Sequence, residues 1–107
     1  MTNFISTGST YWISDEEIHI LEENATNGDK NSAFKLYQYH MFVSFDQDLE
    51  FKWLEIAAEN GHPIAQSNLA DLFFTQGNKE KAIFWAKKAY RNGAKLPDEL
   101  KILININ

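Results

Sequence analysis

The sequence repeats itself at a spacing of 32 residues. A shift by this distance pairs identical residues along the chain: Ala33 with Ala65, Phe42 with Phe74, Trp53 with Trp85, Ala57 with Ala89, Asn60 with Asn92 and Gly61 with Gly93. Periods of roughly 20 to 50 residues are typical of folds that stack one small supersecondary unit on the next. The repeat therefore constrains the architecture before any single motif is considered.

Each unit is predicted to contain two helices. Apolar residues recur three and four positions apart in segment 49–60, namely Leu49, Trp53, Ile56 and Ala57. This spacing places side chains on one face of an α-helix. Three Asn-Gly pairs, at 27–28, 60–61 and 92–93, predict helix ends, because asparagine and glycine tolerate the left-handed backbone of a helix C-terminus.

Helix starts are predicted by other residues. Ser14 and Glu17 have the spacing of a capping box, and Pro63 and Pro97 suit a first helical turn, where a proline misses no hydrogen bond. We expect helices at about 15–27, 31–44, 47–60, 63–76, 79–92 and 97–104. Residues 1–14 are expected to form a loop or cap segment, and residues 15–107 a single helical repeat domain.

These elements predict an all-α fold: a short α/α solenoid of antiparallel helix pairs, with about six helices. The small Ala57 and Ala89 would let neighbouring helices approach, while Trp53 and Trp85 fill the space between units. Solenoid ends need covering, and we expect the N-terminal aromatics to do this; they are Phe4, Tyr11 and Trp12.

The junction between units resembles a known repeat. The run KWLEIAAENGH at 52–62, followed by AQSNLADLF at 65–73, is similar to the Sel-one-like repeat, a relative of the tetratricopeptide repeat. The resemblance covers about residues 29–95, with Gln38 and Ala70 standing where the family has a helical glycine. It implies a right-handed solenoid, and a scaffold or adaptor rather than a catalyst.

Composition and charge exclude several classes of function. The formal net charge of −5 argues against general nucleic-acid binding, which depends on lysine and arginine at phosphates. Residues 1–59 hold 11 acids against 3 lysines, and residues 60–107 hold 7 bases against 4 acids, giving −8 and +3. The chain has no cysteine, no apolar run of membrane-spanning length and no signal-peptide pattern, so we expect a cytoplasmic protein without disulfides or membrane contact.

Chemistry-bearing motifs are missing from the sequence. The three histidines lie in different segments: we expect His19 to face solvent, His40 to pack with a polar edge, and His62 to stand at a helix entry. None has the spacing of a zinc site. There is no glycine-rich phosphate loop or nucleophile motif, and adjacent carboxylates such as Glu16 and Glu17 suit the wet face of a helix. We therefore predict no catalytic residue, no cofactor and no metal.

A solenoid offers a concave groove lined mainly by the first helix of each pair. In the first unit this predicts partner-binding positions at Lys35, Gln38, Tyr39 and Phe42, and in the second at Ser67, Ala70, Asp71 and Phe74. Phe42 and Phe74 have an alternative role in the core between helices. Carboxylates of the acidic half complete the predicted binding set, chiefly Glu16, Glu23 and Asp46, with Asp15, Glu22 and Asp48 beside them.

These features predict a non-catalytic protein–protein interaction module. A groove of about two units suits one dedicated partner, and short acidic repeat proteins without cysteine resemble bacterial immunity proteins, which bind and block a cognate toxin. A regulatory or scaffolding adaptor of a cellular complex is one alternative, and a homo-oligomeric structural module that docks its open ends is another. A monomer is the favoured state.

Overall fold

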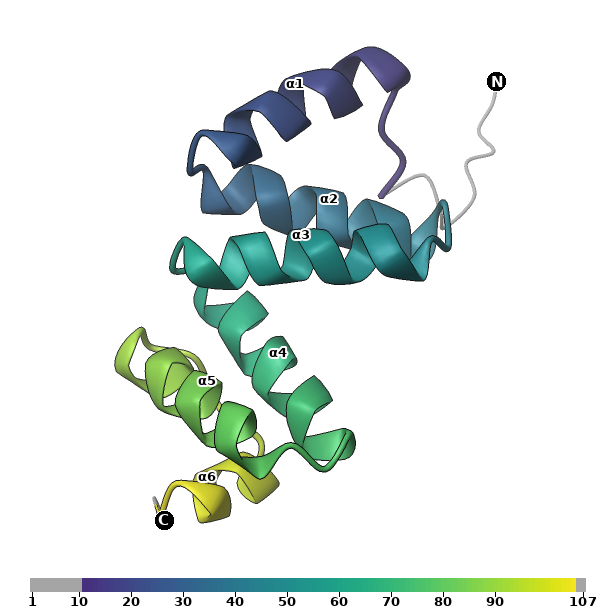
Figure 1. Cartoon of the computed structure of the whole chain (residues 1–107). Coiled ribbons are helices and arrows are strands. Elements are labelled where there is room, and N and C mark those ends of the chain that lie inside the picture. Colours follow the sequence, from purple (N-terminus) through teal and green to yellow (C-terminus); the bar gives the residue numbers. More distant parts are fainter. Residues whose placement is uncertain (1–10, 106–107) are drawn as a thin grey trace, which may run out of the picture.

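The computed structural model describes residues 11–105, and within them the only regular elements are six α-helices (Figure 1). They are α1 (Asp15–Thr26), α2 (Lys30–Phe42), α3 (Gln47–Glu59), α4 (Pro63–Thr75), α5 (Lys79–Arg91) and α6 (Asp98–Leu103). Each lies within two residues of its predicted range, so the all-α prediction is confirmed. Phe4 lies outside the described residues.

Short polar side chains cap the starts of α1, α2, α3 and α5. Ser14 accepts a hydrogen bond from the Glu17 amide at 3.2 Å, as the capping-box spacing predicts, and Asp29, Asp46 and Asn78 cap α2, α3 and α5 in the same way. Pro63 occupies the first turn of α4 as expected. Pro97 does not lie in the first turn of α6: it precedes the helix in an extended conformation, with φ of −63° and ψ of 157°.

Glycines in the left-handed conformation end four of the helices. The three predicted Asn-Gly pairs and Gly77 all have positive φ at the glycine, and each closes its helix with the paired backbone bonds of a Schellman motif. At Gly61, for example, its own N–H donates to Ala58 and the next N–H, of His62, donates to Ala57, both at 3.0 Å. The Asn-Gly prediction of helix stops is therefore confirmed.

Consecutive helices pack side by side, so the chain forms a short solenoid of antiparallel pairs. The closest pairings are α2 with α3 and α4 with α5, while α1 packs on α2, α3 on α4, and α6 on α5. Figure 1 shows α1, α2 and α3 stacked at one end of the molecule and α4, α5 and α6 at the other. The result is an elongated body of 51 × 30 × 23 Å.

Two clusters of buried side chains form the core. The larger joins α1 to α5 around Leu36, Trp53 and Leu69, and the smaller joins α4, α5 and α6 around Leu96 and Leu100. Fully buried alanines line the helix crossings: Ala33, Ala57, Ala65, Ala70, Ala82, Ala86 and Ala89. Trp85 packs against both clusters. The predicted roles of the repeated alanine and tryptophan, close approach and filling between units, are confirmed.

A buried glutamine adds a polar link between the units. Gln66 of α4 is only 2% exposed, and its Nε2 donates to the carbonyl of Ala58 at 3.0 Å, near the end of α3. Its Oε1 accepts a hydrogen bond from Nδ2 of Asn92, the residue that ends α5, at 2.9 Å. One side chain therefore connects three helices across the unit boundary.

Candidate partner-binding surface

The hollow that belongs to the first predicted unit lies beside α2. It has a volume of about 340 Å³, and its lining combines polar and aromatic side chains: Tyr11, Asn31, Phe34, Lys35, Gln38 and His62. Lys35 is exposed and Gln38 half-buried. Two of the predicted binding residues, Lys35 and Gln38, therefore lie together in this hollow. They follow Asn31 by four and seven positions, so all three share one face of α2.

The second and larger hollow lies beside α4, with a volume of about 650 Å³. Its wall on α4 contains Pro63, Ile64, Ser67, Asn68 and Asp71, and the opposite wall is the segment before α6, with Gly93, Ala94, Lys95 and Pro97. The predicted Asp71 is exposed in this hollow, and so is the apolar side chain of Ile64. The lining offers apolar contact together with one charge of each sign.

The two hollows are the same structural feature in successive units. A shift of 32 residues carries Asn31 onto Pro63, Lys35 onto Ser67, and His62 onto Ala94. The hollows also meet at the start of α4, where His62 lines the first and Pro63 the second. We call this pair of hollows the groove, and it follows α2 and α4, the first helices of the two predicted units.

Stacked rings fix the middle of the groove. The imidazole of His62 lies parallel to the ring of Phe34, with centroids 4.1 Å apart and planes 16° from parallel. Its Nδ1 accepts the amide N–H of Ala65 at 3.3 Å, so His62 caps α4 and the predicted helix-entry role is confirmed. Burial, followed by the charge of Lys30, lowers the pKa of His62, which favours the neutral ring that this cap requires.

The predicted aromatic positions are more exposed than a core role allows. Phe42 is 45% exposed and Phe74 is 37% exposed, so the alternative placement of both rings in the core between helices is wrong. Phe74 lies three residues beyond Asp71 and extends the same face of α4. Tyr39 is half-buried, with its ring edge-on to that of His40 at 5.1 Å. Ala70 does not line the groove, because it is fully buried with Ala86 and Ala89 in the smaller core cluster.

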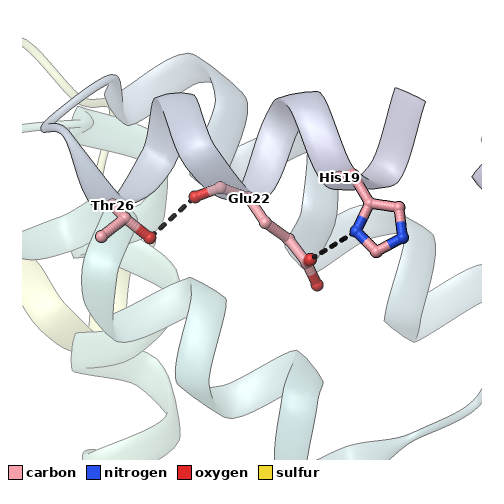
Figure 2. A network of polar contacts seen from close by, with 3 residues as sticks. All are labelled: His19, Glu22 and Thr26. Carbon is pink, nitrogen blue, oxygen red and sulfur yellow. Dashed lines mark hydrogen bonds and ion pairs between the residues drawn. The ribbon is translucent and has the colours of Figure 1, made fainter. Parts of the chain in front are cut away.

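The remaining predicted residues lie outside the groove. Glu16 and Glu23 are exposed on α1, and Asp46 accepts the Leu49 amide at 3.1 Å as the cap of α3. Figure 2 shows three other side chains of α1, His19, Glu22 and Thr26, and His19 Nδ1 lies 3.8 Å from a Glu22 carboxylate oxygen. His19 is exposed, as predicted. The predicted carboxylates thus lie on α1 and at the start of α3, outside the lining of the groove.

Tyr11 and Trp12 do not cover the end of the stack as predicted. Tyr11 packs on Phe42 of α2, with ring centroids 4.4 Å apart, and lines the groove, while Trp12 is mostly exposed. Ile13 is the buried residue of this segment.

Sequence reasoning missed several groove residues. Asn31, Phe34 and His62 line the first hollow, and Ile64 and Lys95 the second, although none was predicted to bind a partner. The 32-residue shift was the signal that could have found the segment before α6, since it carries His62 onto Ala94. Applying the repeat to the loops as well as to the helices would have placed residues 93–97 on the groove.

His40 is the packed histidine that the sequence predicts. It is buried, its Nδ1 lies 2.7 Å from the Ser44 hydroxyl, and its Nε2 has no hydrogen-bond partner among residues 11–105. Burial lowers its pKa, against the opposing carboxylate charges of Asp46 and Glu22. Across residues 11–105, no three or more histidine, aspartate and glutamate side chains are grouped as a metal ion would require. In the same range, no helix has the length and apolar character needed to cross a membrane.

Comparison with known proteins finds a similarity in sequence to a bacterial protein. The chain is 34% identical, over 95 residues, to Uncharacterized protein YibG of Escherichia coli (strain K12). The match covers 82% of this chain and 62% of that protein, so the chain spans less than two thirds of this relative. No protein-family model and no solved structure matches the chain. Membership of the Sel-one-like repeat family therefore stays a prediction based on the repeat positions.

Proposed function

We propose that this chain is a non-catalytic protein-binding module of Sel-like repeats, and that it acts as a bacterial immunity protein that binds and neutralises a cognate toxin. The observation that carries the proposal is the groove along α2 and α4, in which one hollow is repeated in two successive units. A lining with exposed apolar side chains and separated charges of both signs suits a protein segment. A groove of this length accommodates one dedicated partner.

Charge supports the sharper form of the proposal. The −8 balance of residues 1–59 attracts a basic partner, and complementary charges raise association rates more than they raise affinity. Association with the toxin therefore slows as salt is added, because exposed charges are screened beyond about 8 Å at physiological ionic strength. The interaction takes place in the cytoplasm, where the monomeric chain meets the toxin before the toxin reaches its target.

The experiment is affinity capture with the tagged full chain in lysate of its native host, followed by identification of the bound protein and of the proteins encoded beside the gene. The proposal predicts a stoichiometric toxin domain from a neighbouring gene, and restored growth when chain and toxin are produced together. Recovery of a housekeeping protein would favour the adaptor alternative. Recovery of the chain alone, together with a dimer fraction that increases with protein concentration, would favour the homo-oligomer.

A further inference from the structure

The turn between α2 and α3 presents an unusually exposed aromatic side chain. Phe45 is 75% exposed, and its backbone is left-handed, with φ of 57°. The equivalent position of the next unit, 32 residues on, is Gly77, with φ of 83°. Glycine adopts this conformation freely, whereas a residue with a Cβ is disfavoured there because the Cβ comes too close to the following carbonyl oxygen. The fold thus keeps a phenylalanine where its own repeat uses glycine.

Packing against the part of the chain that the structure describes does not explain Phe45, since most of this side chain is exposed. The residues on either side are nonetheless held in place. The Ser44 amide donates to the carbonyl of Tyr39 at 3.1 Å, and the Ser44 hydroxyl, 2.7 Å from His40 Nδ1, accepts the Asp46 amide at 3.3 Å. The buried His40 therefore fixes the turn from which the Phe45 ring projects.

Further aromatic surface lies beside this turn. Phe42, three residues earlier on α2, is 45% exposed and lies against Tyr11 with an angle of 31° between the rings. We call Tyr11, Phe42 and Phe45 the aromatic patch. Exposed aromatic residues of this kind are enriched at the energetic centres of protein interfaces.

The surroundings of the aromatic patch are acidic. Residues 36–51 contain no lysine or arginine, and carry Asp46, Asp48 and Glu50. Figure 1 shows that α1 begins at the same end at which α2 ends and α3 starts. The first turn of α1 therefore adds exposed carboxylates at this end, namely Asp15, Glu16 and Glu17. A complementary surface is apolar at its centre and positively charged around it.

We propose that Phe45 is the anchor of a second contact site, and that it inserts into an apolar pocket rimmed by lysine and arginine on a protein partner. This inference rests on the proposed protein-binding function, and it adds to the groove a contact made by the aromatic patch. The ring stays exposed in the free chain and becomes buried in the complex. The unfavourable backbone at Phe45 is retained for binding rather than for folding.

The test measures the affinity of the captured partner for the full chain and for three variants. Phe45→Ala and Phe45→Gly both remove the ring, and Phe84→Ala is the matched control, because Phe84 is 51% exposed on α5. Both changes at Phe45 are expected to weaken binding about 30-fold, which corresponds to the roughly 2 kcal/mol of a hot-spot residue. The control is expected to stay within about twofold, since near-neutral contacts lose little on truncation.

Thermal unfolding of the free variants separates anchoring from a structural role. Phe45→Gly is expected to melt about 4–16 °C above Phe45→Ala, because only glycine relieves the left-handed backbone. If both Phe45 variants bind the partner with the affinity of the wild type, this inference is overturned and the proposed protein-binding function still stands. Equal melting temperatures of the two variants would also overturn it. Capture of no protein at all would overturn both proposals.

Discussion

The hydrogen bonds of Gln66 allow a quantitative prediction about the boundary between units. Replacing the Gln66 amide with leucine introduces an apolar side chain of similar size and removes the bonds to Ala58, at 3.0 Å, and from Asn92, at 2.9 Å. Each such bond contributes about 1 kcal/mol net to folding. The Ala58 carbonyl retains the Gly61 amide, and the exposed Asn92 regains water, so neither group is left buried without a partner.

We therefore expect Gln66→Leu to lower the free energy of unfolding by about 1–2 kcal/mol. At roughly 4–8 °C per kcal/mol, this lowers the melting temperature by about 4–16 °C. Asn92→Ala removes one of the two bonds and is expected to cost about 0.5–1 kcal/mol. Because the two side chains share that bond, the double variant loses less than the sum of the single losses.

A double-mutant cycle measured by urea unfolding checks this expectation. The expected coupling between Gln66 and Asn92 is about 0.5–1 kcal/mol. Additive losses, with a coupling below about 0.3 kcal/mol, would refute the idea that this hydrogen bond joins the units. A Gln66→Leu variant as stable as the wild type would show that leucine packing offsets both bonds.

Further expectations concern close packing, the left-handed turns and pH. Ala57→Leu should lower the free energy of unfolding, measured in urea, by about 1–3 kcal/mol, because Ala57 is fully buried at a helix crossing. An unchanged free energy of unfolding would mean that the helices can move apart to accommodate leucine. Gly61→Ala should lower the free energy of unfolding by about 1 kcal/mol, because φ at this position is +96°. Among residues 11–105, the added methyl group would meet no atom beyond its two chain neighbours within 4 Å, so the loss comes from the backbone conformation alone. An unchanged melting temperature would contradict this. Burial lowers the pKa of His40 and His62 below 6.5, so the unfolded chain binds more protons than the folded chain as pH falls through 6.5, and stability should decrease. Melting temperatures measured between about pH 7.5 and 5 check that stability falls as pH is lowered. The double variant His40→Gln with His62→Asn should make the melting temperature depend less on pH in this range.

Local signals made the helices predictable from sequence. The Asn-Gly stops, the Ser14 cap and Pro63 act within one or two turns of the chain, so their effects do not depend on the tertiary structure. The repeat then predicted the stacking, because equivalent residues meet equivalent neighbours. Trp53 and Ala57 accordingly pack as the pattern indicates.

Burial at the surface of the stack was harder to predict. A helix in a solenoid contacts neighbours on more than one side, so periodicity alone does not separate the core face from the groove face. This is why Ala70 was expected in the groove, and why a core role for Phe42 and Phe74 stayed open. The packing of Tyr11 on α2 depends on a residue 31 positions away in sequence, which no local pattern reports.

The Phe45 turn shows another limit of sequence reasoning. Its position is aligned with Gly77, but nothing in the sequence indicates that a phenylalanine adopts the same left-handed conformation. The hydrogen bond between His40 and Ser44 connects a buried ring to the turn. Hydrogen bonds within the end of α2 and the turn therefore hold this backbone against the preference of the residue itself.

The most direct test of the central claim, that the groove along α2 and α4 binds a protein partner, is the affinity of that partner for two charge-reversal variants. Asp71→Arg alters the larger hollow, and Glu80→Arg makes the same change at an exposed position on α5. We expect Asp71→Arg to weaken binding at least about tenfold, or about 1.4 kcal/mol, and Glu80→Arg to change it less than about twofold. Equal affinities for both variants and the wild type would contradict the claim.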